Sequence, residues 1–136
     1  MPEIYMLDTN VCSYIIKHRP AALKETFLEH KNDKLCISVV TYAELLYGLE
    51  KNSSQKLERD VTEFVSLVHV IDWNHVAARK YAQTRHALAK KRQAIGSLDM
   101  QIASAAIALG AQLVTNNIKY FGNIEGLKIA DWVLRN

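Results

Sequence analysis

The chain has 136 residues, of which 49% are hydrophobic and 23% charged, with a net charge of +3 at pH 7. This composition is typical of a globular protein and excludes collagen-like and disordered classes, so we expect residues 1–136 to form a single domain. The cysteines, Cys12 and Cys36, stand in apolar runs without zinc-ligand spacing, which indicates buried, reduced thiols. No apolar stretch approaches the roughly 20 residues of a membrane-spanning helix, and no signal peptide is evident. We therefore expect a cytoplasmic protein without membrane association.

Predicted strands and helices alternate along the chain. Residues 4–7 (IYML) are a short apolar run that predicts a strand, and a helix over 10–18 stops before Pro20. Residues 35–40 (LCISVV) are rich in β-branched side chains and predict a second strand. The other predicted elements are helices over 21–31, 41–51, 55–68, 75–93 and 98–110, and strands over 69–72, 111–115 and 127–131. Strands separated by helices favour an α/β fold, with a parallel sheet covered by helices on both faces.

A carboxylate stands at the point where the first predicted strand ends. In an open α/β sheet, ligands bind outside the carboxyl ends of the strands, and Asp8 lies on that edge. The structural alternative is that Asp8 caps the following helix, but Thr9 and Asn10 can cap a helix equally well. The position of Asp8 therefore favours a role in a site.

Two further carboxylates are expected on the same edge. Glu44 lies in the first turns of the helix after the second strand, and its same-face neighbours, Val40 and Tyr47, are apolar or aromatic. We therefore expect Glu44 to face protein and to be compensated by a cation, because a lone buried glutamate is costly. Asp99 lies in the first turn of the helix over 98–110, where the helix dipole offers a purely structural role. Its neighbours one turn later are apolar, so it too is predicted to face inward.

Three inward carboxylates on one edge predict a bound cation. Like charges about 4 Å apart repel by roughly 4 kcal/mol at an effective dielectric constant of about 20. Oxygen ligands without histidine or cysteine suit Mg²⁺ or Mn²⁺. Such an ion lowers the pKa of a bound water and stabilises charge on a phosphoryl oxygen.

The basic residues are concentrated in one interval. Between Asp72 and Asp99 there is no acidic residue, but the interval carries six cationic side chains: Arg79, Lys80, Arg85, Lys90, Lys91 and Arg92. Such asymmetry indicates a surface that binds a polyanion, although a solvated helix face gives the same pattern. Beside a metal site, these side chains are predicted to hold the phosphates of a substrate.

The sequence resembles the PIN-domain ribonucleases, and more narrowly the VapC toxins of bacterial toxin–antitoxin pairs, over essentially its whole length. The motifs that carry the resemblance are YMLDTN, TYAEL, IGSLDMQIASAA and LVTNNIKYF. It implies a three-layer α/β/α sandwich with a mostly parallel central sheet, and an Mg²⁺- or Mn²⁺-dependent endoribonuclease that cleaves structured RNA such as tRNA. It assigns Asp8, Glu44 and Asp99 to the acidic metal site, with Thr9 and Thr115 as supporting hydroxyls.

One motif departs from the family pattern. Many PIN domains carry a fourth acid just after the last-motif threonine, where this chain has Asn116 and Asn117. An asparagine offers an oxygen but no charge, so we expect one firm metal site and a weak or substrate-borne second one. The predicted supporting set is Thr9, Asn10, Thr115, Asn116 and Asn117.

The resemblance also implies partners. A cognate VapB-like antitoxin is expected to cover the site, and the chain is expected to form a homodimer and, with the antitoxin, a larger hetero-oligomer. The first helix and the helix that carries Glu44 would border the antitoxin groove. They offer six apolar or aromatic side chains, about half of which we expect in the core: Tyr14, Ile15, Tyr42, Leu45, Leu46 and Tyr47.

Two other functions remain open from the residues. A haloacid-dehalogenase-type phosphatase needs a D-x-D pair after the first strand, but the second position is Asn10, and a receiver domain needs adjacent acids there. A non-catalytic RNA-binding module would use the basic interval alone and would leave Glu44 and Asp99 unexplained.

Overall fold

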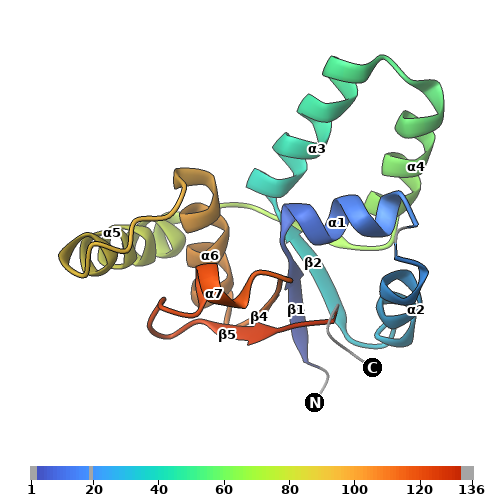
Figure 1. Cartoon of the computed structure of the whole chain (residues 1–136). Coiled ribbons are helices and arrows are strands. Elements are labelled where there is room, and N and C mark those ends of the chain that lie inside the picture. The colour runs from blue at the N-terminus through green and yellow to red at the C-terminus, as the bar shows by residue number, and fades with distance from the viewer. Residues whose placement is uncertain (1–2, 19, 133–136) are drawn as a thin grey trace.

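The computed structural model describes residues 3–18 and 20–132. Figure 1 shows the elements in space. They are β1 (Ile4–Leu7), α1 (Thr9–Ile16), α2 (Ala21–Glu29), β2 (Lys34–Ser38), α3 (Val39–Asn52), α4 (Gln55–Ser66), β3 (His69–Ile71), α5 (His75–Lys90), α6 (Ser97–Leu109), β4 (Gln112–Val114), α7 (Ile118–Phe121) and β5 (Lys128–Ala130). The predicted alternation is confirmed, and α7 is an addition to it.

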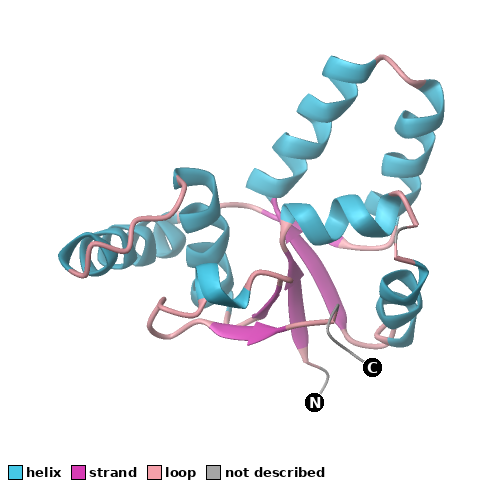
Figure 2. Cartoon of the chain, viewed as in Figure 1, coloured by secondary structure: helices cyan, strands magenta, loops and turns pink. Residues whose placement is uncertain are grey.

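The strands form one parallel sheet in the order β3-β2-β1-β4-β5 (Figure 2). Tyr5 of β1 is in register with Leu35 of β2 on one side and with Gln112 of β4 on the other. The chain builds β2 and β3 outward from β1, then crosses back to place β4 on the other side of β1. The sheet therefore has its topological switch point between β1 and β4, where α/β proteins bind ligands.

Helices cover both faces of the sheet. Successive residues of a strand point to opposite faces, and the buried side chains of Met6 and Leu7 accordingly join different core clusters. Leu7 packs with residues of α1, α2 and α4, whereas Met6 packs with residues of α5 and α6. This arrangement confirms the predicted α/β/α sandwich, from which α3 and α4 extend as a helical hairpin (Figure 1).

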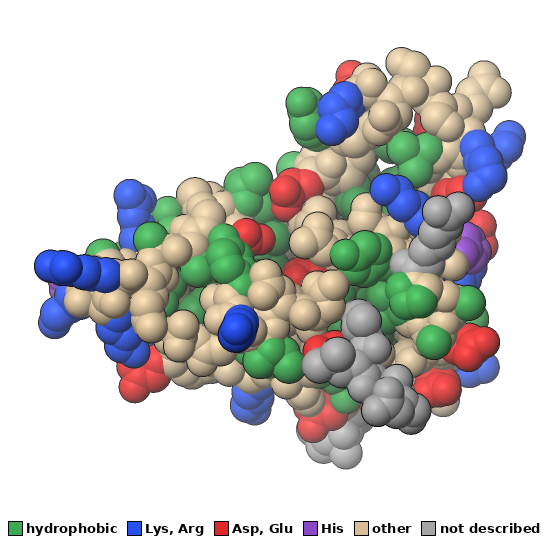
Figure 3. Space-filling model, in the orientation of Figure 1, with side chains coloured by type: hydrophobic (Ala, Val, Ile, Leu, Met, Phe, Trp, Pro, Cys, Tyr) green, Lys and Arg blue, Asp and Glu red, His purple; other side chains and the backbone are tan. Residues whose placement is uncertain are grey.

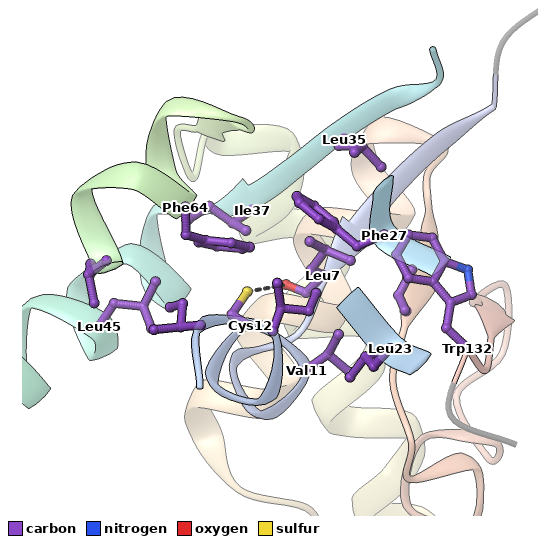
Figure 4. Packing of buried hydrophobic residues seen from close by; sticks show 14 residues of the cluster. Leu7, Val11, Cys12, Leu23, Phe27, Leu35, Ile37, Leu45, Phe64 and Trp132 are labelled. Carbon is purple, nitrogen blue, oxygen red and sulfur yellow. Dashed lines mark hydrogen bonds between the residues drawn. The ribbon is translucent and has the colours of Figure 1, made fainter. Parts of the chain in front are cut away.

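Aromatic packing joins helices in the core cluster around Leu7. Phe27 and Phe64 bring α2 and α4 together, with ring centroids 5.6 Å apart (Figure 4). Cys12 and Cys36 are buried free cysteines, as predicted. Burial raises the pKa of Cys12 well above its usual value and that of Cys36 to about 12. Both therefore remain protonated thiols at neutral pH, without the thiolate character that reactive cysteines need.

Local capping explains where the helix boundaries differ from prediction. α3 begins earlier than expected, because the Ser38 hydroxyl accepts a hydrogen bond from Val40 N–H at 3.1 Å. α5 ends at Lys90, and Arg92 takes a left-handed conformation with φ of 56°. α7 is too short for an apolar periodicity, and it starts where the Asn117 side chain accepts from Tyr120 N–H at 3.3 Å. Within residues 3–18 and 20–132, no helix has both the length and the apolar character needed to cross a membrane.

Candidate active site

Asp8 joins the end of β1 to the start of α1. Its backbone N–H donates to Val114 O of β4 at 3.0 Å, which fixes it at the switch point. Its side chain is 4% exposed, and Oδ1 accepts a hydrogen bond from Val11 N–H at 2.8 Å. Asp8 is thus itself the N-cap of α1, the structural role for which the sequence offered Asp8, Thr9 and Asn10 as candidates. The same carboxylate also lines a pocket at this edge, so capping and a site role coexist.

A threonine hydroxyl holds Glu44. Thr9 Oγ1 donates to Glu44 Oε1 at 2.6 Å and lies 3.2 Å from the buried Thr41 Oγ1. Glu44 is half-buried, but Tyr47 is 65% exposed, so only part of this helix face turns inward. Among the described residues, no lysine or arginine lines the pocket, so the cation expected beside Glu44 is not a side chain of this lining. The hydrogen-bond partner that the structure gives the Glu44 carboxylate is the Thr9 hydroxyl.

Asp99 enters the pocket from the first turn of α6. It is half-buried, and the next turn of the helix supplies Ile102 and Ala103, which are fully buried, as predicted for an inward face. Gly96 precedes this turn, and its backbone N–H donates to the Tyr120 hydroxyl at 2.6 Å. The position of Asp99 therefore depends on α7 as well as on α6.

The pocket gathers residues from four separate segments of the chain. Its lining residues are Asp8, Thr9, Asn10, Glu44, Asp99, Asn117, Tyr120 and Phe121. Thr115 lies beneath it, fully buried, and accepts from Asn117 N–H at 3.1 Å. Asn116 is half-buried and is not among the lining residues. Figure 3 shows acidic side chains near the centre of one face of the molecule, with lysine and arginine side chains around them.

Tyr120 and Phe121 were not predicted as site residues. Both stand inside the motif LVTNNIKYF, but they lie on α7, which is too short to show a helical period in the sequence. A polar side chain on such a short helix carries no sequence signal beyond the motif itself.

Among the described residues, the lining of this pocket has three carboxylates and no lysine or arginine. Burial raises the pKa of Asp8, and the nearby charges of Asp99 and Glu44 raise it further. The hydrogen-bonding Thr115 hydroxyl and the Val11 N–H oppose this rise in pKa without cancelling it. A cation in the pocket would relieve the same repulsion.

The donor set has the chemistry of a hard-cation site. Carboxylate, hydroxyl and amide oxygens suit Mg²⁺ and Mn²⁺. Across the part of the chain that the structure describes, no three Asp, Glu, His or Cys side chains are gathered closely enough to hold a metal alone. Mg²⁺ usually keeps several waters and binds through one or two carboxylates, so these residues fit an ion whose coordination water completes.

The six predicted RNA-binding residues all lie on α5 or just after it, and they divide between surfaces. Arg85 Nη1 donates to the Tyr81 hydroxyl at 3.2 Å, and that hydroxyl lies 3.4 Å from Ser97 Oγ, at the start of α6. Lys80 and Lys91 instead line a second pocket, together with residues 123–126. Arg79, Lys90 and Arg92 are exposed. The structure thus brings the acidic residues together but spreads the basic ones.

A parallel sheet with an acidic pocket at its switch point defines an α/β protein of the PIN type. The chain belongs to the PIN domain family, whose model matches residues 5–127. Within this family it falls in the VapC group. The tRNA(fMet)-specific endonuclease VapC of Shigella flexneri is 40% identical over 129 residues, which cover 94% of this chain and 97% of that protein. Ribonuclease VapC2 of Rickettsia felis is 40% identical over 131 residues, which cover 95% and 98%.

Solved structures show the same similarity. The VapBC2 structure from Rickettsia felis, bound to a DNA fragment from its promoter, contains a chain with a TM-score of 0.89 and 37% identity. The match covers 95% of this chain and 98% of that one. DNA-bound VapBC from Salmonella typhimurium gives a TM-score of 0.85 and 39% identity, with 97% and 99% covered.

Replacing Asp8 by asparagine tests the charge balance of the pocket. Asparagine retains the N-cap of α1 and removes a buried charge. Because the folded-state pKa of Asp8 is raised, the folded parent binds more protons than the unfolded chain just above the usual pKa, and its stability falls as the pH rises through that range. We expect Asp8→Asn, in chelator, to be at least as stable as the parent at pH 7 and to lose this part of the pH dependence.

The measurement is urea unfolding of both proteins from about pH 4, near the ordinary aspartate pKa, upward. A variant that is clearly less stable than the parent at pH 7 would show that the charged form of Asp8 is favoured in the fold, against this account.

Proposed function

We propose that the chain is a metal-dependent endoribonuclease and the toxin of a toxin–antitoxin pair. The observation that carries the proposal is the convergence of Asp8, Glu44 and Asp99 in one pocket at the switch point of a PIN-family sheet. The names of the VapC relatives support RNA as the substrate. A phosphatase of the D-x-D type finds no support, because Asn10 lines the pocket where that pattern needs its second acid.

The mechanism assigns each residue a task. Asp8 and Asp99 would hold Mg²⁺ or Mn²⁺, which when bound lowers the pKa of water and stabilises charge on a phosphoryl oxygen. Thr9 fixes Glu44 Oε1 through its hydroxyl, so that this carboxylate can orient the water for in-line attack on the phosphodiester. The amide of Asn10 and that of Asn117 border the pocket and can hydrogen-bond water or a phosphate oxygen.

The substrate proposed is a structured RNA, with tRNA first. Two relatives, from Shigella flexneri and Salmonella typhimurium, are named tRNA(fMet)-specific endonucleases and share 40% and 39% identity with this chain. Cleavage of an initiator tRNA would stop translation, which is the effect expected of a toxin.

RNA cleavage with controlled metal tests the proposal. We expect initiator tRNA to be cut in Mg²⁺, left intact in EDTA, and cut again when Mn²⁺ is added back. Asp8→Asn should lower the cleavage rate by about 100-fold or more. Loss of a direct metal ligand is expected to cost more than loss of an outer-shell partner, which costs about 10- to 100-fold. An elongator tRNA is the matched control for selectivity, and mapping of new RNA 5′ ends after overexpression finds the cleavage position.

Other outcomes identify other functions. Full cleavage in EDTA or by Asp8→Asn would contradict the acidic metal site. Tight RNA binding without cleavage under any metal would favour the non-catalytic RNA-binding module.

The basic residues on and after α5 are proposed to contact substrate phosphates. Each true contact contributes about 0.7–0.9 to the slope of log affinity against log salt concentration. Replacing Lys90, Lys91 and Arg92 by alanine should therefore flatten that slope, measured with tRNA and the Asp8→Asn background to prevent cleavage. Arg85→Ala is the comparison variant. The Arg85 guanidinium is hydrogen-bonded to the Tyr81 hydroxyl, which lies next to Ser97 at the start of α6. An unchanged slope in the triple variant would assign that cluster to solubility.

A VapB-like antitoxin is proposed to bind along α1 and α3. Of the six side chains predicted there, Ile15 and Leu45 are in the core and Tyr42 packs against it. Three remain exposed: Tyr14 (37%), Leu46 (41%) and Tyr47 (65%). This exposed apolar surface suits an amphipathic partner helix. We also propose that the chain forms a homodimer and, together with the antitoxin, a larger hetero-oligomer.

Co-expression with the short reading frame directly upstream tests the partner. We expect the two products to co-purify and the partner to suppress cleavage. Leu46→Asp with Tyr47→Asp should abolish co-purification by placing charge in the apolar surface, whereas Leu109→Asp, a similarly exposed leucine (37%) at the far end of α6, should not. If the upstream product neither co-purifies nor inhibits, the toxin assignment fails even if the nuclease assignment survives.

A further inference from the structure

We propose that Tyr120 is a positioning residue that keeps the Asp99 carboxylate in the pocket, an inference that rests on the proposed function of that pocket. Tyr120 lies on α7 and lines the pocket, but it contributes no carboxylate. Its role follows from the one backbone group that its hydroxyl binds.

That group is the N–H of Gly96, the N-cap residue of α6. Glycine offers no side-chain cap, and Asp99 stands three residues later, at the third position of the helix. An acid at this position commonly reaches back to the N-cap backbone N–H and forms half of a capping box. Here the Tyr120 hydroxyl accepts from that N–H at 2.6 Å. The Tyr120 hydroxyl thus occupies the Gly96 N–H, which would otherwise be free to bind the Asp99 carboxylate and move it out of the pocket.

The geometry around Gly96 places the competing acceptors side by side. A Cβ built on Gly96 would lie 3.4 Å from Asp99 Oδ2 and 3.4 Å from the Tyr120 hydroxyl oxygen. Asp99 Oδ2 is therefore near enough to turn to Gly96 N–H after a small side-chain rotation. Replacing the tyrosine hydroxyl by hydrogen would leave the Gly96 N–H free to donate to Asp99 Oδ2.

Tyr120 is anchored to the other side of the pocket. Its backbone N–H donates to Asn117 Oδ1 at 3.3 Å, and Asn117 N–H donates to Thr115 Oγ1 at 3.1 Å. Thr115 in turn hydrogen-bonds to the Asp8 carboxylate. A continuous set of contacts thus runs from Asp8 at the end of β1, around the pocket, to the start of the helix that carries Asp99.

Tyr120→Phe tests the inference, because it removes the hydroxyl and keeps the ring. We expect Mn²⁺, titrated alone into the full chain by calorimetry, to bind about 10-fold more weakly, as for loss of an outer-shell partner. The turnover number for RNA should fall while KM stays near that of the parent. A crystal structure of the variant should show Asp99 within hydrogen-bonding distance of Gly96 N.

Tyr81→Phe is the matched control. The Tyr81 hydroxyl also reaches the first turn of α6, at 3.4 Å from Ser97 Oγ, but Tyr81 does not line the pocket. We expect this variant to bind Mn²⁺ with the affinity of the parent. Equal weakening in both variants would show a general loosening of α6 and would overturn the specific role of Tyr120.

Three further outcomes separate this inference from the proposed function. If Asp8→Asn loses Mn²⁺ binding but Tyr120→Phe binds it as the parent does, the positioning role is overturned and the metal site survives. A raised KM with unchanged Mn²⁺ affinity would make Tyr120 a substrate contact instead, which also overturns the inference. If the parent binds no Mn²⁺, the proposed metal site fails, and the inference fails with it.

Discussion

The burial of the Asp8 carboxylate at the end of the central strand is the constraint on which the rest of the site depends. A buried carboxylate must be hydrogen-bonded or paired, because an isolated buried charge is costly. Here the compensation is built from neutral groups: the Val11 N–H, as a helix cap, and the Thr115 hydroxyl. β1 lies between β2 and β4, so these groups come from the segment that follows β1 and from the end of its neighbour. The sheet order thus decides which residues can surround Asp8.

The helices that start at this edge explain how further carboxylates are tolerated. The N-terminus of a helix carries partial positive charge, which favours an acid within the first turn. Asp8 caps α1, and Asp99 lies in the first turn of α6, so both gain from this effect. Glu44 lies beyond the first turn of α3 and gains less from its own helix. It is held instead by the Thr9 hydroxyl, which is itself in the first turn of α1. The residue that follows Asp8 in the chain therefore holds the Glu44 carboxylate.

Structural features that depend on residue patterns could be predicted from the sequence, whereas those that depend on a single hydrogen bond could not. The alternation of strands and helices, the parallel sheet and the convergence of Asp8, Glu44 and Asp99 follow from apolar periodicity and from the rule that strand ends meet at one edge. The hydrogen bond from Thr9 to Glu44 was not predicted, because a hydroxyl 2.6 Å away does not appear in a charge pattern.

Contacts between residues that are far apart in the sequence could not be predicted for the same reason. Tyr120 meets Gly96 across 24 positions of the chain, and neither residue belongs to a periodic pattern that marks it as polar and inward. The spread of the basic residues over two surfaces depends on the face of α5 that each one occupies, since Arg85 reaches Tyr81 whereas Lys80 lines the second pocket. The sequence identifies the basic interval, but it does not show which face of α5 each basic residue occupies.

Asn117 connects the departure from the family pattern with the charge of the pocket. Its side-chain oxygen caps α7 by accepting from Tyr120 N–H. An aspartate could cap the same helix, but it would add a fourth negative charge to a pocket that already raises the pKa of Asp8. Asparagine keeps the cap and avoids that repulsion. The amide at this position therefore preserves the contacts that anchor Tyr120 without requiring a second cation to balance another acid.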